Sequence, residues 1–255
     1  MRYCFTVDDN IRFLKEIAEH EYGSIFEHPY AAMLKRLHER FDTKIQLNLF
    51  YRTAGFDLSK MPVRYRDEWA ANADWLKLSF HADHENENPY ADAAYDTVFA
   101  DCARVQREIL RFAGEETLAA TTTVHYCQTT TDGVKALADN GVKGLLGLYG
   151  TAAAPMTSYS VPLETAARIR AGEVMVHGGV TMAAINMIIN TLPYDALLPV
   201  LGKFEGREEL HVMIHEQYFY TDYAAYQADF EKKLVAVLTW LSTHDYRSVF
   251  FEECV

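Results

Sequence analysis

The sequence lacks most of the features that would assign it to a class at once. Its four cysteines are scattered over 255 residues without a Cys-x-x-Cys pair, so neither a zinc knuckle nor a disulfide framework is indicated. No apolar run reaches the roughly 20 residues that a bilayer span requires. The first aspartate, Asp8, also comes too early for the apolar core of a signal peptide. We therefore expect a cytoplasmic protein with reduced thiols.

Positive charge is scarce as well. The chain contains 24 lysine and arginine residues against 36 aspartate and glutamate residues, which gives a formal net charge of −12. Nucleic acid and an anionic membrane surface would both be repelled by this excess of negative charge. We expect neither as a partner, whereas self-association into a homo-oligomer stays open.

Short apolar segments alternate with amphipathic ones along the chain. The segments predicted as strands are residues 2–7, 44–51, 75–82, 121–128, 144–150, 209–219 and 246–251. The segments predicted as helices are residues 29–41, 89–112, 131–141, 194–202 and 223–242. Strand–helix–strand repetition favours a parallel sheet, and seven or eight such units in a chain of this length favour a closed barrel. We predict a single β/α-barrel domain over residues 1–255.

Polar side chains stand where several of these strands end. The strand ends that carry them are Asp8-Asp9, His81, His125 and His215-Glu216. All strands of a β/α barrel open their carboxyl ends onto one face, so these side chains are expected to converge. For the adjacent aspartates, the alternative is a turn that caps the following helix, because aspartate is a good cap residue.

A divalent metal would account for two adjacent aspartates. Zinc and related ions accept carboxylate oxygen and imidazole nitrogen, and hydrolytic sites keep one position open for water. Asp9, His81 and a further histidine can supply such an Asp/His/His set. Asp8 would then be free to take a proton from water, and His215 to donate one to the leaving group.

Three segments resemble motifs of the polysaccharide deacetylases and their wider glycoside hydrolase/deacetylase superfamily. The segments are Thr6-Val7-Asp8-Asp9, SFHADHENENPY (79–90) and LHVMIHE (210–216). The resemblance implies a distorted (β/α)7 barrel with Asp8 as catalytic base and His215 as catalytic acid. It also implies a divalent metal, zinc above all, held by Asp9, His81 and His84.

The sequence departs from the family pattern at two places. His81 and His84 lie three residues apart instead of four, and VHYCQTTTDG (124–133) has no arginine where the family has an Arg-Pro-Pro-Tyr-like motif. The third metal ligand is therefore left open between His84, His125 and Glu216. His125 can also replace the arginine as hydrogen-bond partner of the base.

By the same resemblance, the protein is a metal-dependent hydrolase of C–N bonds. Its substrate would be a small molecule or an oligosaccharide that carries an N-acetyl group. The residues expected to contact this substrate are His125, Trp75, Glu216 and Tyr149. Two alternatives stay open. One is a glycoside hydrolase that uses paired carboxylates such as Asp8 and Glu216, and the other is a carbohydrate-binding barrel that has lost its activity.

Overall fold

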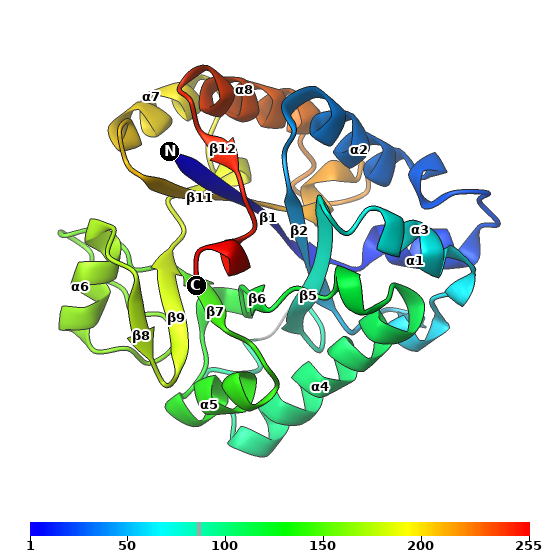
Figure 1. Ribbon diagram of the computed structural model, residues 1–255, viewed down its shortest axis with the longest axis horizontal. Coiled ribbons are helices and arrows are strands. Elements are labelled where there is room, and N and C mark those ends of the chain that lie inside the picture. The colour runs from blue at the N-terminus through cyan, green and yellow to red at the C-terminus, as the bar shows by residue number, and fades with distance from the viewer. Residues whose placement is uncertain (86–87) are drawn as a thin grey trace.

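The structure is a computed structural model that describes residues 1–85 and 88–255, so Asn86 and Glu87 of the histidine-rich segment lie outside the described residues. It confirms the predicted fold class, a distorted (β/α)7 barrel in which helices surround mostly parallel strands (Figure 1). Within the described ranges, no helix is both long enough and apolar enough to cross a membrane.

The barrel strands fall into two sheets. The first has the order β10 (Met187–Ile188), β11 (Glu209–His215), β1 (Arg2–Asn10), β2 (Ile45–Phe50) and β5 (Leu76–Ala82). The second has the order β6 (Thr121–Thr122), β7 (Gly144–Gly147), β9 (Val180–Ala184) and β8 (Met175–His177). All neighbouring pairs are parallel except β8 with β9. A short antiparallel pair, β3 (Arg52–Thr53) and β4 (Phe56–Asp57), stands apart.

Short backbone contacts connect the two sheets on both sides. Between β5 and β6, Leu78 forms a parallel bridge with Leu118, and the amide of Ala119 donates to the Leu78 carbonyl at 2.9 Å. On the other side, the amide of Ile185 donates to Gly147 at 2.9 Å and the next amide, of Asn186, donates to His211 at 2.9 Å. The chain thereby passes from the second sheet to β11 and completes the ring of strands.

The helices form the outer layer. They are α1 (Arg12–Glu19), α2 (Pro29–Phe41), α3 (Arg66–Ala71), α4 (Tyr95–Phe112), α5 (Thr131–Asp139), α6 (Leu163–Ala171), α7 (Leu197–Leu201) and α8 (Phe230–Thr243). The bounds of α2 match the prediction because local signals mark both ends. Pro29 begins the helix and Asp42 ends it in a left-handed conformation at φ 50°.

Several predicted elements are shorter in the structure. The helix predicted over residues 89–112 begins only at Tyr95, and the one predicted over 223–242 begins at Phe230. The strand predicted over 121–128 ends at Thr122 in the structure. The second half of the predicted strand forms a sharp turn at His125–Cys127 instead. Helices α1, α3 and α6 were not predicted.

The C-terminal segment closes the amino-terminal end of the barrel. After β12 (Arg247–Ser248) has paired with β1, the turn Phe251–Glu253 lies over the middle of the ring (Figure 1). Phe251 is 1% exposed. A Cβ atom on Gly144 of β7 would lie 2.7 Å from the Phe251 ring, so only glycine lets the ring approach this strand.

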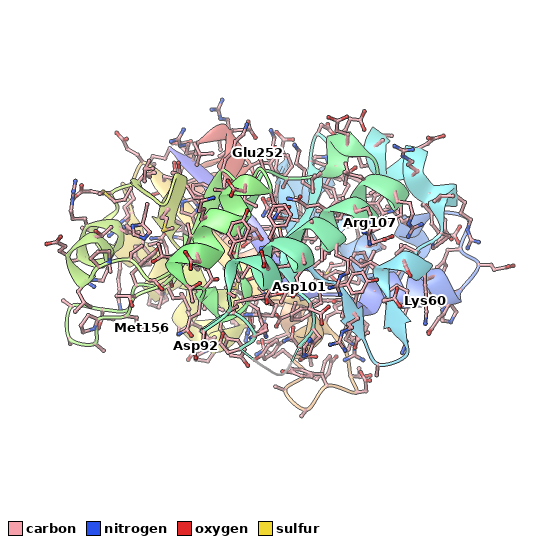
Figure 2. All side chains as sticks on the ribbon, turned by 90° about the horizontal axis from the view of Figure 1, so that it is seen from below. Lys60, Asp92, Asp101, Arg107, Met156 and Glu252 are labelled. Atoms are coloured by element: carbon pink, nitrogen blue, oxygen red, sulfur yellow. The ribbon has the colours of Figure 1, made fainter. Side chains whose placement is uncertain are left out.

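Polar contacts hold this plug, residues 247–253, against several strands. The carboxylate of Glu252 accepts a hydrogen bond from the Ala120 amide at 2.7 Å and pairs with Lys77 at the start of β5. Lys44, just before β2, pairs with Glu253 at 2.7 Å. Figure 2 shows Glu252 on one side of the molecule and Met156, which borders the cavity described below, on the opposite side.

We expect Phe251→Ala to lower the free energy of unfolding by about 3–5 kcal/mol, because it empties a closely packed space inside the barrel. Urea denaturation measures the change. The matched control is Phe99→Ala on α4, whose side chain is 36% exposed, and it should cost about 1 kcal/mol or less. Equal losses in the two variants would show that Phe251 contributes no more to stability than an exposed phenylalanine does.

Candidate metal centre

A break in the regular pairing of β1 brings two adjacent aspartates to one cavity. Successive side chains of a strand point to opposite faces, so Asp8 and Asp9 of a regular strand would diverge. Here the register with β2 shifts between Val7 and Asn10, and Asp9 takes a left-handed conformation at φ 63°. A bulge of this kind redirects a side chain. Both aspartates consequently line the same cavity.

Asn10 stabilises this bulge. Its side-chain amide donates to the carbonyl of Val7 at 2.6 Å and to the carbonyl of Asn48 at 3.2 Å. These bonds tie the irregular part of β1 to the neighbouring strand β2. The hydroxyl of Tyr30 donates to the remaining side-chain oxygen of Asn10 at 3.2 Å.

The aspartates do not cap the following helix, α1. The cap comes from Glu216, whose carboxylate accepts hydrogen bonds from the backbone amides of Ile11, Arg12 and Phe13 at 2.7, 3.0 and 2.7 Å. Burial raises the pKa of Glu216 to about 7, against these three bonds and a fourth from Tyr220 that favour the charged form.

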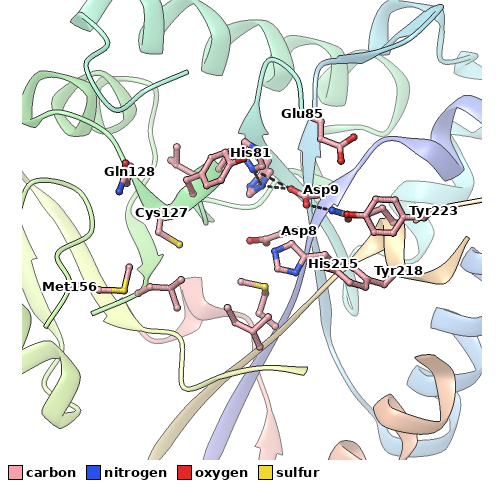
Figure 3. Close-up of a pocket in the computed structure, with 17 residues that line it drawn as sticks. Asp8, Asp9, His81, Glu85, Cys127, Gln128, Met156, His215, Tyr218 and Tyr223 are labelled. Carbon is pink, nitrogen blue, oxygen red and sulfur yellow. Dashed lines mark hydrogen bonds and ion pairs between the residues drawn. The ribbon is translucent and has the colours of Figure 1, made fainter. Parts of the chain in front are cut away.

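Asp9, His81 and His125 bring three ligand atoms together (Figure 3). The distance from Asp9 Oδ1 to His81 Nε2 is 2.9 Å, and to His125 Nδ1 it is 3.3 Å. The two ring nitrogens lie 3.1 Å apart. All three residues are buried, and they come from β1, β5 and the turn after β6.

The hydrogen bonds of His81 show which of its nitrogens carries a proton. Its Nδ1 lies 2.5 Å from the carbonyl of Thr123, which can only accept, so Nδ1 is the donor. Nε2 of the neutral ring then presents a lone pair to the carboxylate of Asp9 and to His125 Nδ1. A proton on Nε2 can be shared with Asp9 or with His125, but not with both at once. A cation between Asp9 Oδ1, His81 Nε2 and His125 Nδ1 can bind all three atoms.

The spacing of the three atoms fits zinc. Ligands at 2.0–2.1 Å from a tetrahedral zinc ion lie about 3.3 Å from one another. The three observed distances, 2.9, 3.1 and 3.3 Å, are close to that value. Nε2 of His125 is buried without a hydrogen-bond partner among the described residues. Two imidazoles and one carboxylate form a donor set that zinc and related transition metals accept.

The electrostatics of the site separate the two aspartates. Burial raises the pKa of Asp9, but the neighbouring imidazoles of His125 and His81 outweigh burial and hold it well below its usual value. For Asp8, burial dominates and raises the pKa above the usual value. Burial also opposes the charged form of His81, yet the neighbouring Asp8 and Asp9 raise its pKa overall. Asp9 is therefore a permanent anion, and Asp8 is the carboxylate better suited to take up a proton.

Side-chain amides of β2 position Asp8. The amide of Asn48 donates to Asp8 Oδ1 at 2.6 Å, and its own oxygen accepts from Gln46 at 2.8 Å. Gln46 in turn accepts from the hydroxyl of Thr121 on β6 at 2.9 Å. This chain of bonds runs through the barrel interior. Asn48, rather than an arginine or His125, holds the aspartate that the family resemblance identifies as the base.

His215 reaches the cavity from the end of β11. Its backbone amide donates to Asn190 Oδ1 at 3.1 Å, which identifies that atom as the oxygen. The ring atom Nδ1 lies 2.9 Å from the same oxygen and must therefore be the donor. Nε2 is left for a ligand in the cavity, where His215 stands beside Asp8 (Figure 3).

Two successive left-handed residues shape the turn that carries His125. Tyr126 has φ 59° and Cys127 has φ 55°. Such conformations cost on the order of 1–3 kcal/mol each in residues other than glycine, and they concentrate at functional sites. The turn places His125 against Phe50, with ring centroids 4.9 Å apart, and leaves Tyr126 55% exposed at the cavity mouth.

The cavity has a volume of about 480 Å³, within the range of small-molecule sites. Five residues predicted from the sequence line it: Asp8, Asp9, His81, His125 and His215. Four others do not, namely His84, Trp75, Tyr149 and Glu216. The side chains of the first set reach the cavity, whereas those of the second set do not.

Each of these four side chains is engaged elsewhere. Nδ1 of His84 lies 2.8 Å from Asp83, which also pairs with Arg52. Trp75 stacks on His38 at a centroid distance of 4.4 Å, on the outside of the barrel. Tyr149 is buried, 2% exposed, with its hydroxyl toward a methionine sulfur. Glu216 is turned toward the start of α1, so it supplies neither a metal ligand nor the second carboxylate of a glycosidase pair.

Sequence reasoning missed Gln217 and Asn48. Nε2 of Gln217 donates to Asp9 Oδ2 at 2.5 Å and fixes the aspartate from the side opposite the histidines. The sequence carried a signal for Asn48, because Gln46 and Asn48 are two polar residues on one face of the otherwise apolar segment Ile45–Phe50. Gln217 follows the predicted His215 but carries no pattern of its own.

No family model matches the chain, and no curated protein matches it. Among solved structures, a 4-α-glucanotransferase from Thermococcus litoralis superposes with a TM-score of 0.61 at 12% identity, over 99% of this chain and 40% of that one. The chain thus spans less than half of the transferase.

Two further matches cover both chains almost fully. A candidate polysaccharide deacetylase from Mycobacterium smegmatis matches with a TM-score of 0.59 at 12% identity, over 99% of this chain and 88% of that one. A family 4 acetyl xylan esterase from Clostridium thermocellum, solved in complex with a cobalt ion, matches with a TM-score of 0.54 at 11% identity, over 99% and 89%. At these identities the likeness shows the fold, which is that of the polysaccharide deacetylases.

The geometry predicts that His125, and not His84, completes the metal site. After loading with zinc and dialysis, the wild type and His84→Ala should retain one equivalent of zinc. His125→Ala and Asp9→Ala should retain less than about a tenth of it, since each removes one of three ligands. Elemental analysis measures the content. Loss of zinc in His84→Ala together with retention in His125→Ala would reverse the assignment.

Proposed function

We propose that the protein is a metal-dependent hydrolase that cleaves an amide bond, namely that of the N-acetyl group of a sugar or of a small conjugate. The observation that carries the proposal is the placement of Asp8 and His215 in the same cavity as the Asp9, His81 and His125 donor atoms. The deacetylase-like fold and the cobalt ion of the structurally similar esterase support it.

Asp9, His81 and His125 would hold the metal, which we take to be zinc from the two-nitrogen, one-oxygen donor set. When bound, a divalent ion of this kind acidifies water and polarises a carbonyl group. Gln217 keeps the second oxygen of Asp9 occupied by its hydrogen bond at 2.5 Å. Asp9 is thereby oriented to offer its other oxygen, Oδ1, to the metal.

Asp8 acts as the general base. Asn48 occupies one of its oxygens, so the other is available to accept the proton of the attacking water. The raised pKa that burial gives Asp8 strengthens it as a base relative to an exposed aspartate. The amide chain from Thr121 through Gln46 and Asn48 fixes the carboxylate before the substrate arrives.

His215 acts as the general acid. Since its Nδ1 proton is committed to Asn190, the proton for the leaving nitrogen must come from Nε2 of the doubly protonated ring. The leaving amine departs with that proton, while the acyl carbon keeps the water oxygen. Asp8 and His215 thus divide the two proton transfers between two adjacent strand ends, β1 and β11.

The proposal predicts that Asp8→Asn keeps its zinc but loses at least about 100-fold in kcat, because the amide cannot accept the proton. Release of acetate from N-acetylglucosamine oligomers and from N-acetylated small amines measures the rate. Asp139→Asn, an exposed residue on α5, is the matched control.

Two results would contradict the proposal. Full activity in Asp8→Asn would remove Asp8 as the base. A zinc-loaded wild type that releases no acetate from any of these compounds would favour a barrel that has lost its activity, which was the alternative left open by the sequence.

A further inference from the structure

One wall of the cavity is built from hydrogen-bond acceptors and aromatic rings. We call it the acceptor wall and define it by Glu85, Gln217, Tyr218 and Tyr223, all of which line the cavity. Figure 3 shows Glu85, Tyr218 and Tyr223 on one side of Asp9, with Gln128 and Met156 on the other. The acid–base mechanism uses none of the four as a proton donor or acceptor.

Glu85 is a half-buried carboxylate that has no ion-pair partner within the described part of the chain. It also makes no hydrogen bond with the residues that the structure describes. Burial and the charge of Asp9 raise its pKa, and they outweigh the opposite effect of the Arg12 charge. It lines the main cavity and also a neighbouring one of about 360 Å³. The arginine of that second cavity, Arg12, is already paired with Asp222 at 2.6 Å.

Gln217 adds an unpartnered acceptor. Its side chain is only 8% exposed, and its amide nitrogen is committed to Asp9. The amide oxygen, Oε1, is buried and has no hydrogen-bond partner among residues 1–85 and 88–255. A buried oxygen of this kind is stabilised only when a donor reaches it. The amide nitrogen cannot take its place, because a flip would set oxygen against the carboxylate.

The remaining members of the wall are aromatic. The rings of Tyr218 and Tyr223 meet edge to face with centroids 5.2 Å apart. Ring faces attract cations, and they do so more strongly in partly desolvated sites. None of the residues that line the main cavity is a lysine or an arginine. The wall therefore combines a carboxylate, a buried amide oxygen without a donor and two aromatic rings, which together suit an ammonium group.

We propose that the acceptor wall binds a primary ammonium group of the substrate, so that the protein acts on N-acyl compounds that carry a free amine near the acyl group. The hydrolysis of the acyl group rests on the proposed function. The binding of the ammonium group rests on the acceptor wall alone. Such an ammonium group occurs in partly deacetylated amino-sugar oligomers and in aliphatic diamines. The second cavity beyond Glu85 gives either chain room to continue.

Binding tests the wall without requiring catalysis. The cationic probes are 1,4-diaminobutane and the fully deacetylated glucosamine disaccharide, and their neutral counterparts are 1,4-butanediol and N,N′-diacetylchitobiose. Calorimetric titration of the zinc-loaded wild type should show about tenfold tighter binding of a cationic probe than of its counterpart, as one charge-assisted hydrogen bond provides. The pair that shows the difference identifies the source of the amine.

Glu85→Gln should abolish this discrimination, whereas Glu39→Gln, an exposed change on α2, should preserve it. An amine that binds through the metal instead would lose affinity on metal removal and keep it in Glu85→Gln. Equal affinities for cationic and neutral probes in the wild type, or discrimination that survives in Glu85→Gln, would overturn the proposal.

Hydrolysis then separates this inference from the proposed function. The compounds are mono-N-acetyl-1,4-diaminobutane against N-butylacetamide, and mono-N-acetyl- against di-N-acetylchitobiose. We expect kcat/KM to be about tenfold higher for the cationic member of the responsive pair. Cleavage of both members at equal rates would refute ammonium binding by the acceptor wall but leave the proposed hydrolysis intact. Binding discrimination without any cleavage would refute the proposed hydrolysis but leave ammonium binding intact.

Discussion

The close approach of Asp9 Oδ1, His81 Nε2 and His125 Nδ1 is the constraint on which the rest of the site depends. These three ligand atoms lie within 3.3 Å of one another, a spacing at which one cation can bind all of them. The chain accepts strain to bring them together, with left-handed backbone at Asp9 and at Tyr126. The surrounding fold holds these residues in place, through Gln217 on one side and the Thr123 carbonyl on the other.

The two ends of the barrel differ in function, because one stabilises the fold and the other carries the candidate metal centre. At the amino-terminal end, Phe251 and the acidic side chains beside it close the ring of strands, which stabilises the arrangement of the strand ends opposite. At the carboxyl end, polar side chains replace the apolar core. Asn48 illustrates the transition, because it is a fully buried residue whose hydrogen bond to Asp8 links the rigid interior to the proposed chemistry.

The sequence predicted the part of this site that follows from strand direction alone. Asp8, Asp9, His81 and His215 lie within the last three residues of their strands, His125 follows β6 in a turn, and parallel strands carry their ends to one face. It did not predict the start of α1, because the cap of that helix is Glu216, more than 200 residues away in the chain. Nor could it decide between His84 and His125, since a turn with two left-handed residues sets the direction of His125. Such long-range contacts and irregular turns leave no periodic pattern.

An anomalous-scattering map of zinc-loaded crystals tests the central claim most directly. The account predicts a single strong peak at about 2.0–2.2 Å from Asp9 Oδ1, His81 Nε2 and His125 Nδ1. A peak bound instead by Asp83 and His84, or no peak within reach of Asp9, would contradict it.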